Sequence, residues 1–284
     1  MKRSFSPLRY PGGKASIYDL ASDIIISHDM QSCQYAEPYA GGCGLALALL
    51  FEGVVDELYL NDIDPSIASL WQTILEQPNE LVKLITTTKL DMDEWYRQKA
   101  IQNDKANVDP LSLAFSTLYL NRTNRSGIIK AGVIGGKAQS GFYKMDCRFN
   151  KDNIIKRIYA IADRQNKIHI FNLDAIEFIG QLENLALSKP LLMIDPPYYN
   201  KGQQLYTNFY KHEDHVNIAN KLSETKLPWL LTYDNTPEIS ELYKEFAQYE
   251  FNISYTLATK RKGNELLITS HSFGPIQHNR VTAA

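Results

Sequence analysis

The chain has 284 residues and a net charge of −2, and 44% of its residues are hydrophobic and 22% charged. This composition is ordinary for a globular protein, and the length suffices for one large domain or one domain with an insertion. We expect no membrane association, because no apolar run approaches the roughly 20 residues that span a bilayer.

The start of the chain and its cysteines predict a cytoplasmic protein. The basic start MKRSFSPLRYPGGK has no apolar stretch of the kind found in a signal peptide. Cys33, Cys43 and Cys147 form no C-x-x-C pair, and an odd, sparse set favours reduced thiols over disulfides. The same set argues against zinc, so we expect no metal.

Charge is distributed unevenly along the chain. Residues 121–167 contain eleven Lys or Arg and three Asp, a net charge of +8, which leaves −10 for the remainder. Asymmetry of this size indicates a surface that binds a polyanion such as nucleic acid, or else a solvated basic face.

Helices and strands are expected to alternate in the first and last parts of the chain. A helix is expected over 14–30, strands over 34–37 and 57–63, and a further helix from Pro65, which suits a first helical turn. Later strands are expected over 167–174, 190–195 and 228–235, then a helix from about Thr236 to Tyr249 and an antiparallel strand pair at 250–258 and 265–270. This alternation predicts an α/β fold whose mostly parallel sheet has helices on both faces.

The alternation breaks between residues 76 and 161. Two stretches there, LVKLITTTKLDMDEWYRQKAI and PLSLAFSTLYLNR, are expected to be helical, and the glycine- and lysine-rich IIKAGVIGGKAQSGFYK is expected to form a hairpin or mobile loop. We therefore expect one domain made of 1–75 and 162–284, with 76–161 inserted in it. The insertion holds most of the basic cluster.

The stretch LLMIDPPYYN, residues 191–200, ends a buried strand with a carboxylate and continues with two prolines and two tyrosines. A polar group at the carboxyl end of a strand in an α/β sheet faces the ligand crevice. Proline fixes φ and removes an N–H donor, so Asp195 and the Pro196 carbonyl form a stiff pair of acceptors beside aromatic rings. Such a pair suits a flat ligand that carries an amine; the alternative is a Pro-rich turn with half-buried tyrosines.

A glycine loop and an acid about 20 residues later indicate a cofactor of the adenosine type. EPYAGGCG (37–44) lies between an expected strand and helix, where glycines let the backbone approach a ligand. In LNDID (60–64), Asp62 stands where nucleotide-binding folds hydrogen-bond a ribose. The alternatives are a tight turn for the loop and a helix cap for Asp62. No G-x-x-x-x-G-K-[ST] phosphate loop is present.

Three further features are weaker. PLRYPGGK (7–14) combines aromatic, glycine and basic residues, and its alternative is a flexible arm. In NLDAIEF (172–178), Asp174 at a strand end either accepts from an adenine amine or caps a helix. His212 and His215 are expected on the surface of a polar helix rather than at a metal.

Taken in order, PLRYPGGK, EPYAGGCGLAL, LNDID, an insertion, NLDAIEF and DPPYYN resemble the Dam-like class of S-adenosylmethionine-dependent DNA adenine-N6 methyltransferases. The resemblance covers essentially the whole chain, and the DPPY element is specific for amino-group methyltransferases. One position departs from the pattern: Cys43 stands where the family more often has Gly or Ala, so we expect local repacking there. The resemblance implies a Rossmann-like sheet with an antiparallel terminal strand and a mainly helical DNA-recognition insertion that contains a hairpin.

The resemblance also assigns roles to individual residues. Asp195 and Pro196 would accept hydrogen bonds from the target amine within the catalytic element Asp195, Pro196, Pro197 and Tyr198, and Tyr198 would stack on the flipped base. The expected cofactor-binding residues are Tyr10, Lys14, Glu37, Gly41, Gly42, Gly44, Asp62, Asp174 and Asp195. The expected DNA-binding residues are Arg9, Arg122, Arg125, Lys144, Arg148 and Lys151.

The expected partner is double-stranded DNA, with a cognate restriction endonuclease as a further partner and the enzyme acting as a monomer. Two alternatives stay open: an RNA adenine-N6 methyltransferase, whose base pocket would look alike, and a DNA-binding protein without catalysis. The recognised bases do not follow from the sequence, although GATC-like sites occur in the family.

Overall fold

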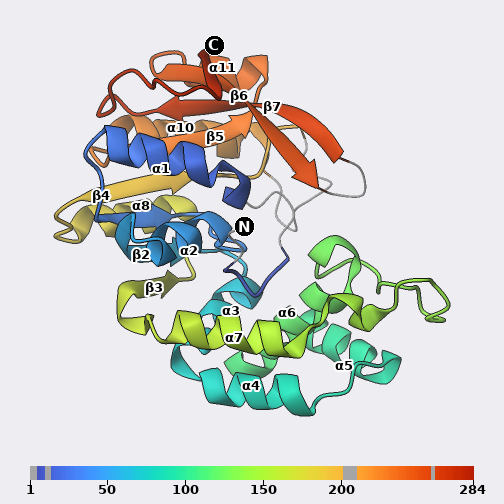
Figure 1. Cartoon of the computed structure of the whole chain (residues 1–284). Coiled ribbons are helices and arrows are strands. Elements are labelled where there is room, and N and C mark those ends of the chain that lie inside the picture. The colour runs from blue at the N-terminus through green and yellow to red at the C-terminus, as the bar shows by residue number, and fades with distance from the viewer. Residues whose placement is uncertain (1–4, 10–13, 201–209, 257–259) are drawn as a thin grey trace.

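The structure is a computed structural model that describes residues 5–9, 14–200, 210–256 and 260–284 (Figure 1). Within these ranges eight strands form one sheet in the order β3-β2-β1-β4-β5-β7-β6-β8. The strands are β1 (Cys33–Glu37), β2 (Val55–Asn61), β3 (Ile168–Phe171), β4 (Pro190–Ile194), β5 (Trp229–Asp234), β6 (Ala247–Thr256), β7 (Lys260–Thr269) and β8 (Val281–Ala283). The first five are mutually parallel, and the last three pair antiparallel, as predicted for the end of the chain.

Helices cover both faces of the sheet, and the alternation of side chains explains why. Leu191 and Met193 of β4 lie in one apolar cluster, and Leu192 and Ile194 lie in another. The first cluster includes η1 (Lys14–Ile17), α1 (Tyr18–Ser27), α2 (Gly44–Phe51) and α3 (Pro65–Glu76); the second includes α8 (Ala175–Asn184), α10 (His212–Glu224) and α11 (Pro237–Leu242). A parallel sheet buried on both faces results.

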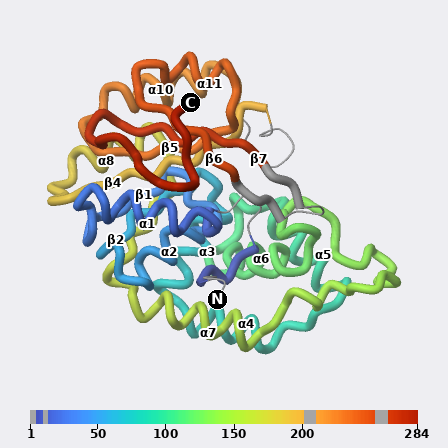
Figure 2. The backbone as a smooth tube through the Cα atoms, turned by 45° about the horizontal axis from the view of Figure 1, so that its top comes forward, coloured from blue at the N-terminus to red at the C-terminus, as the bar shows by residue number. Residues whose placement is uncertain are grey.

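The residues between α3 and β3 form a helical part that Figures 1 and 2 place below the sheet. Its helices are α4 (Pro78–Thr87), α5 (Met92–Asn103), α6 (Pro110–Thr123) and α7 (Lys151–Ala162), with short 3₁₀ turns η2 (Arg125–Gly127), η3 (Met145–Arg148) and η4 (Gln165–Lys167). The helix α6 is buried almost throughout and packs on α3, α4 and α5. Its core residues belong to the same cluster as α1 to α3, so the sheet and the helical part share a continuous core.

Two expected elements differ from the structure. Over 128–144, where a hairpin or a mobile loop was expected, the structure shows a series of turns in place of a hairpin, with one isolated bridge between Asn124 and Val133 among the described residues. The helix expected from Thr236 to Tyr249 ends at Leu242, because β6 already begins at Ala247 and pairs along β7. Ladder pairing along ten residues outweighs the local helical pattern of apolar residues there.

Across the described ranges no helix combines the length and the apolar character that crossing a membrane requires.

Candidate active site

The strand order places a ligand crevice at the carboxyl ends of β1 and β4. From these two neighbouring central strands the chain continues outward in opposite directions, to β2 and β3 on one side and to β5 on the other. Such a switch point is where open α/β sheets bind their ligands. Glu37 ends β1 and Asp195 directly follows β4, so both predicted acids stand at this point.

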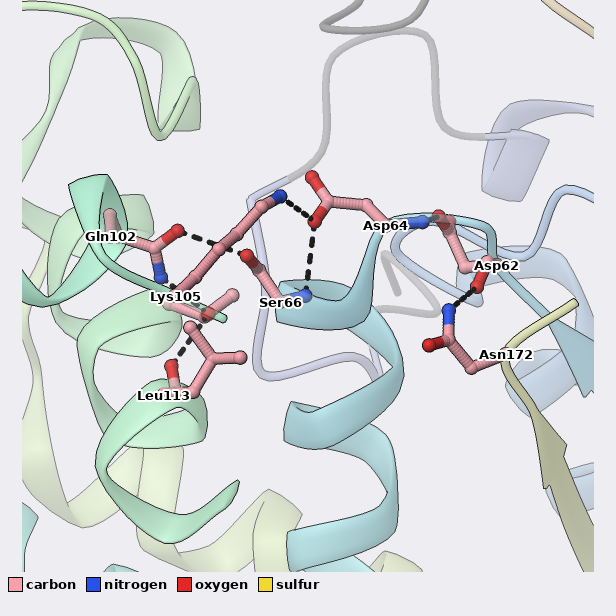
Figure 3. A network of polar contacts seen from close by, with 8 residues as sticks. Asp62, Asp64, Ser66, Gln102, Lys105, Leu113 and Asn172 are labelled. Carbon is pink, nitrogen blue, oxygen red and sulfur yellow. Dashed lines mark hydrogen bonds and ion pairs between the residues drawn. The ribbon is translucent and has the colours of Figure 1, made fainter. Parts of the chain in front are cut away.

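The glycine loop between β1 and α2 is tied to the end of β2 by Asp62. The Gly41 amide donates to Asp62 Oδ2 at 2.9 Å. The Asp64 amide donates to Asp62 Oδ1 at 2.9 Å, and Asn172 Nδ2 donates to the Asp62 carbonyl at 2.7 Å (Figure 3). Trp71 Nε1 on α3 donates to the Gly41 carbonyl at 2.9 Å and so ties the loop to that helix. Burial raises the pKa of Asp62 to about 6, although the two amide hydrogen bonds lower it.

The loop turns through left-handed backbone at two places. Gly41 has φ 47° and Cys43, the residue just before α2, has φ 49°. Glycine adopts this region without cost, whereas a side chain at positive φ is uncommon. The buried Cys43 therefore occupies a position that suits glycine, the one at which the sequence departs from the family pattern.

The carboxylate acceptors around this loop fit S-adenosylmethionine. A carboxylate has about four lone-pair positions, and the two amides use one on each oxygen of Asp62, which leaves two for ribose hydroxyls. Glu37 is 8% exposed and accepts from the Tyr35 hydroxyl at 2.9 Å. Burial and the nearby Asp195 raise the pKa of Glu37 to about 8, although the hydrogen bond from Tyr35 lowers it. A cationic amino group beside Glu37 would therefore stabilise the ionised carboxylate.

Asp195 is held by two side chains that reach the same oxygen. Thr232 Oγ1 on β5 donates to Asp195 Oδ1 at 3.0 Å, and the ammonium of Lys14 lies 3.2 Å from that oxygen. Burial and Glu265 raise the pKa of Asp195 to about 6, while Lys14 and Thr232 oppose the shift. Burial lowers the pKa of Lys14, but Asp195 and Glu265 outweigh it and the net pKa is raised, so Lys14 is charged.

Tyr198 is buried and anchored by its hydroxyl. It donates to Glu265 Oε1 at 2.5 Å and accepts from Lys14 Nζ, whose ammonium lies 5.0 Å from the centre of the Tyr198 ring. Lys14 also donates to Glu265 Oε2 at 2.8 Å. Sequence reasoning singled out Lys14 and Tyr198 but missed Glu265. The only sign of Glu265 in the sequence is that an acid begins the expected strand ELLITS, directly before three apolar residues.

The backbone after the DPPY element is held by a second acid that the sequence reasoning missed. The amides of Tyr199 and Asn200 donate to the two carboxylate oxygens of Asp234, each at 3.0 Å. Asp234 ends β5, so it fixes the exit of the chain from the neighbouring strand. Tyr10, expected to line this cleft, lies outside the described residues.

His215 corrects the sequence reasoning, which placed it on the surface. It is 1% exposed, and its Nδ1 lies 2.6 Å from the Tyr233 hydroxyl in an aromatic cluster with Tyr199 and Tyr210. Burial lowers its pKa. His215 faces Tyr233 of β5, while His212, the first residue of α10, stays exposed at the start of the helix. Among the described residues no group of three His, Cys, Asp or Glu is arranged to hold a metal ion.

The remaining cofactor candidates occupy structural positions near the loop. Asp174 is the N-cap of α8 and accepts from the Ile176 amide at 2.8 Å, the alternative that the sequence left open. Asp64, not Asp62, caps α3 through the Ser66 amide. Gly42 is buried in the loop, and Gly44 begins α2 at a point where an added Cβ would lie 3.4 Å from the Ala15 side chain.

A polar network links this loop to the helical part (Figure 3). Lys105, just after α5, contacts Asp64 Oδ1 at 2.7 Å, and Ser66 Oγ donates to Gln102 Oε1 on α5 at 3.0 Å. Gln102 donates in turn to Thr117 of α6 at 2.9 Å. The helical part therefore holds the start of α3, directly beside Asp62.

Two of the predicted DNA-binding arginines lie inside a positive cluster. Asn121 pins the Arg9 backbone from both sides, accepting from its amide at 2.8 Å and donating to its carbonyl at 2.9 Å. Burial, then Arg157 and Arg9, lowers the pKa of Arg122 to about 10. A phosphate here would relieve the repulsion among these guanidinium groups.

The other predicted DNA-binding residues differ in how available they are. Arg125, Lys144 and Arg148 are exposed. The ammonium of Lys151 instead donates to two carbonyls at the end of α4, at 2.8 and 3.1 Å. Phe142 and Tyr143, at 94% and 61% exposure, stand beside Lys144 and were not singled out from the sequence.

A sheet covered on both faces, with Glu37 at the end of β1 and Asp62 and Asp195 directly after β2 and β4, is typical of α/β proteins that bind nucleotides. Residues 10–257 match the D12 class N6 adenine-specific DNA methyltransferases, and the chain belongs to this family. This confirms the resemblance seen in the sequence: the chain is a DNA adenine methyltransferase, and its cofactor is S-adenosylmethionine.

Other similarities are more distant. The Type II methyltransferase M.CviBI of Paramecium bursaria Chlorella virus NC1A is 25% identical over 268 residues, which cover 92% of this chain and 96% of the relative. Among solved structures, PH1948 of Pyrococcus horikoshii has a TM-score of 0.43 at 10% identity, covering 93% of this chain and 87% of that one. The rRNA methyltransferase AviRa of Streptomyces viridochromogenes has a TM-score of 0.34 at 10% identity, covering 90% and 85%.

Proposed function

We propose that the chain is a site-specific enzyme that methylates the N6 amine of an adenine turned out of duplex DNA, with Asp195 as the acceptor that aims the amine. The observation that carries this is the Asp195 carboxylate at the switch point, which is 20% exposed and whose described contacts with Lys14 and Thr232 both fall on Oδ1. Oδ2 is then the oxygen that accepts from the amine.

The chemistry asks mainly for positioning. An adenine amine is a poor nucleophile, because its lone pair is delocalised into the ring. Acceptors on its two hydrogens, the Asp195 carboxylate and the Pro196 carbonyl, oppose that delocalisation and orient the nitrogen. S-adenosylmethionine supplies the methyl group when bound. Prolines 196 and 197 keep the acceptors rigid, because each fixes its own φ.

We propose that the loop residues divide the cofactor between them. Glu37, Gly41, Gly42 and Gly44 would hold the methionine end, Asp62 the ribose, and Asp174 the region of the adenine. The two acceptor positions left on Asp62 and the raised pKa of Glu37 support these roles. Tyr10 and Lys14 would line the cleft between cofactor and base, with Lys14 charged beside Asp195.

The target base must leave the duplex to reach Asp195, and Tyr198 would replace part of its lost stacking. The Tyr198 hydroxyl is held by Glu265 and Lys14, so the base would stack on a ring whose orientation is fixed.

Residues 76–161, which make up most of the helical part, would be the recognition domain. Arg122 and Arg125 adjoin the end of α6 and the η2 turn, which favours base or near-base contacts, with Arg9 beside them. The exposed Lys144 and Arg148 suit phosphates, and Lys151 suits them only if it leaves the end of α4. The exposed Phe142 and Tyr143 offer flat faces for stacking on bases.

We also propose a monomer that acts beside a cognate restriction endonuclease in a reducing cytoplasm. The name of the relative M.CviBI, a Type II methyltransferase, supports the endonuclease, and the free cysteines Cys33, Cys43 and Cys147 support the compartment. Sedimentation of the free protein tests the monomer.

The test of the function compares nucleic acids as methyl acceptors. The purified protein is incubated with labelled S-adenosylmethionine and equal amounts of duplex DNA or structured RNA, and methylated adenines are identified in the digests. Label in N6-methyladenine of DNA is expected. Label in RNA alone would favour the RNA methyltransferase, and DNA binding without label would favour the non-catalytic protein.

A further inference from the structure

Glu265 is a buried acid that none of the predicted roles uses. It lies on β7, where it pairs with Asp234 of β5 and Phe251 of β6, and it is 1% exposed. Acids are almost never buried to this degree unless they are paired. Its two carboxylate oxygens contact two different residues of the site, Tyr198 through Oε1 and Lys14 through Oε2.

The four side chains Lys14, Asp195, Tyr198 and Glu265 are joined to one another by hydrogen bonds and ion pairs. One ammonium faces two carboxylates, and it lies closer to Glu265, at 2.8 Å, than to Asp195, at 3.2 Å. Lys14 and Glu265 share the Tyr198 hydroxyl between them. The elements that bring these residues together are far apart in sequence, because η1, the β4 end and β7 meet only in the folded sheet.

We propose that Glu265 is a positioning residue of methyl transfer: it draws the Lys14 ammonium away from Asp195 and fixes the Tyr198 ring. This inference rests on the proposed function of that site. Without the Glu265 charge, Lys14 has Asp195 as its remaining carboxylate partner in the set. A tighter Lys14–Asp195 pair competes with the target amine for the Asp195 carboxylate, and the Tyr198 hydroxyl loses its hydrogen bond to a charged carboxylate.

The same geometry predicts how activity depends on pH. Asp195 must be ionised to accept from the amine, and its pKa is raised to about 6 by burial and by Glu265. Removing the Glu265 charge lowers the pKa of Asp195, and a closer Lys14 lowers it further. The acid limb of activity therefore moves to lower pH. The ionisable groups around Asp195 are Lys14 on η1, Tyr35 and Glu37 on β1, Tyr198 after β4, Tyr233 on β5 and Glu265 on β7.

The test compares Glu265→Gln with a matched control, Glu250→Gln. Glu250 lies on the adjacent strand β6 and also accepts from two side chains, Asn235 and Asn264, each at 2.9 Å, but it does not belong to the set around Asp195. Single-turnover methyl transfer to duplex DNA is measured from pH 5 to 9. The dissociation constants for S-adenosylmethionine and DNA are measured by calorimetry, and folding is checked by thermal melting.

For Glu265→Gln we expect a plateau rate reduced by about tenfold or more, with both dissociation constants within about threefold, because Glu265 acts through other residues. The acid limb moves to lower pH by about one unit, the size of shift that a neighbouring charge produces. Glu250→Gln keeps both the rate and the limb of the wild type.

Three results would overturn the inference. They are an unchanged rate, a reduced rate with an unmoved acid limb, and a loss explained wholly by weaker binding or by unfolding at the assay temperature. Wild-type protein that transfers no methyl group to DNA would instead sink the proposed function, and this inference with it.

Discussion

At the scale of single residues, the site depends on which carboxylates are ionised. Asp62 and Asp195 have pKa values raised to about 6, and Glu37 to about 8, with burial as the largest cause for all three. Different partners stabilise the ionised form of each carboxylate. Backbone amides donate to Asp62, Lys14 and Thr232 contact Asp195, and the Tyr35 hydroxyl donates to Glu37. Strongly shifted groups that gather in a crevice are typical of functional sites.

Asp62→Ala is expected to weaken S-adenosylmethionine binding. Hydrogen bonds from ribose hydroxyls to a charged carboxylate contribute about 1.5–3 kcal/mol, so the dissociation constant should rise by about 10- to 100-fold. Isothermal titration calorimetry measures it. Asp64→Asn is the control, because Asp64 caps α3 and pairs with Lys105 without a predicted cofactor contact. Equal affinities for wild type and Asp62→Ala would remove Asp62 from the ribose site.

The Glu37→Gln variant is expected to gain unfolding free energy relative to the wild type as pH rises. The folded pKa of about 8 lies above the ordinary 4.5, so the folded state binds a proton that the unfolded state has released. The unfolding free energy of the wild type therefore falls with pH between these values, by about 1.4 kcal/mol per pH unit from this group. The variant lacks this loss. Denaturant unfolding at pH 5 and pH 8 gives the difference, and a gap that does not widen between the two would show that Glu37 is ionised at neutral pH.

At the scale of elements, the sequence predicted strands and their ends better than it predicted loops. The strands end in the acids Glu37, Asp62 and Asp195, because the pattern of apolar residues followed by a polar one has a direct geometric meaning in a parallel sheet. Of the hairpin or loop expected over 128–144, the hairpin is wrong because glycine turns decide the backbone there, and the long helix expected after Thr236 is wrong because strand pairing ends it early.

The residues that the sequence could not reveal act across long separations. Glu265 meets Lys14 from 251 positions away, and no local pattern marks such a pair. His215 is buried because α10 packs on β5, although its sequence neighbours are polar. Asp234 holds the backbone after DPPY from the next strand. Each depends on which strands become neighbours.

The exposed basic residues of the helical part are predicted to set how DNA binding depends on salt concentration. Each phosphate contact contributes about 0.9 to the slope of log affinity against log salt. Lys144→Ala and Arg148→Ala, both at exposed positions, should each flatten the slope by about that amount and weaken binding to all duplexes. Lys226→Ala, exposed after α10, is the control and should leave the slope unchanged.

Fluorescence titrations with duplexes at several salt concentrations measure these slopes. If neither Lys144→Ala nor Arg148→Ala differs from the Lys226 control, this face of the helical part does not lie on the DNA backbone.

At the scale of the whole molecule, the part proposed to read DNA and the part proposed to bind the cofactor are joined by packing and by polar contacts. The continuous core joins α4–α7 to the sheet, and Lys105 and Gln102 hold the start of α3 beside Asp62 (Figure 3). The sheet then brings Asp195, Lys14 and Glu265 together at the opposite side of the switch point. Contacts of this kind suit an enzyme that must align a base and a methyl donor within bonding distance.

The central claim is that Asp195 activates an adenine amine of DNA, and it is tested most directly by mapping modified adenines in cells that express the protein. DNA from cells with the wild type should carry N6-methyladenine at one recurring sequence. DNA from cells with Asp195→Ala should carry at least about 100-fold less, while the purified variant binds S-adenosylmethionine within about tenfold of the wild type. Methylation by Asp195→Ala at the wild-type level and at the same sites would contradict the account.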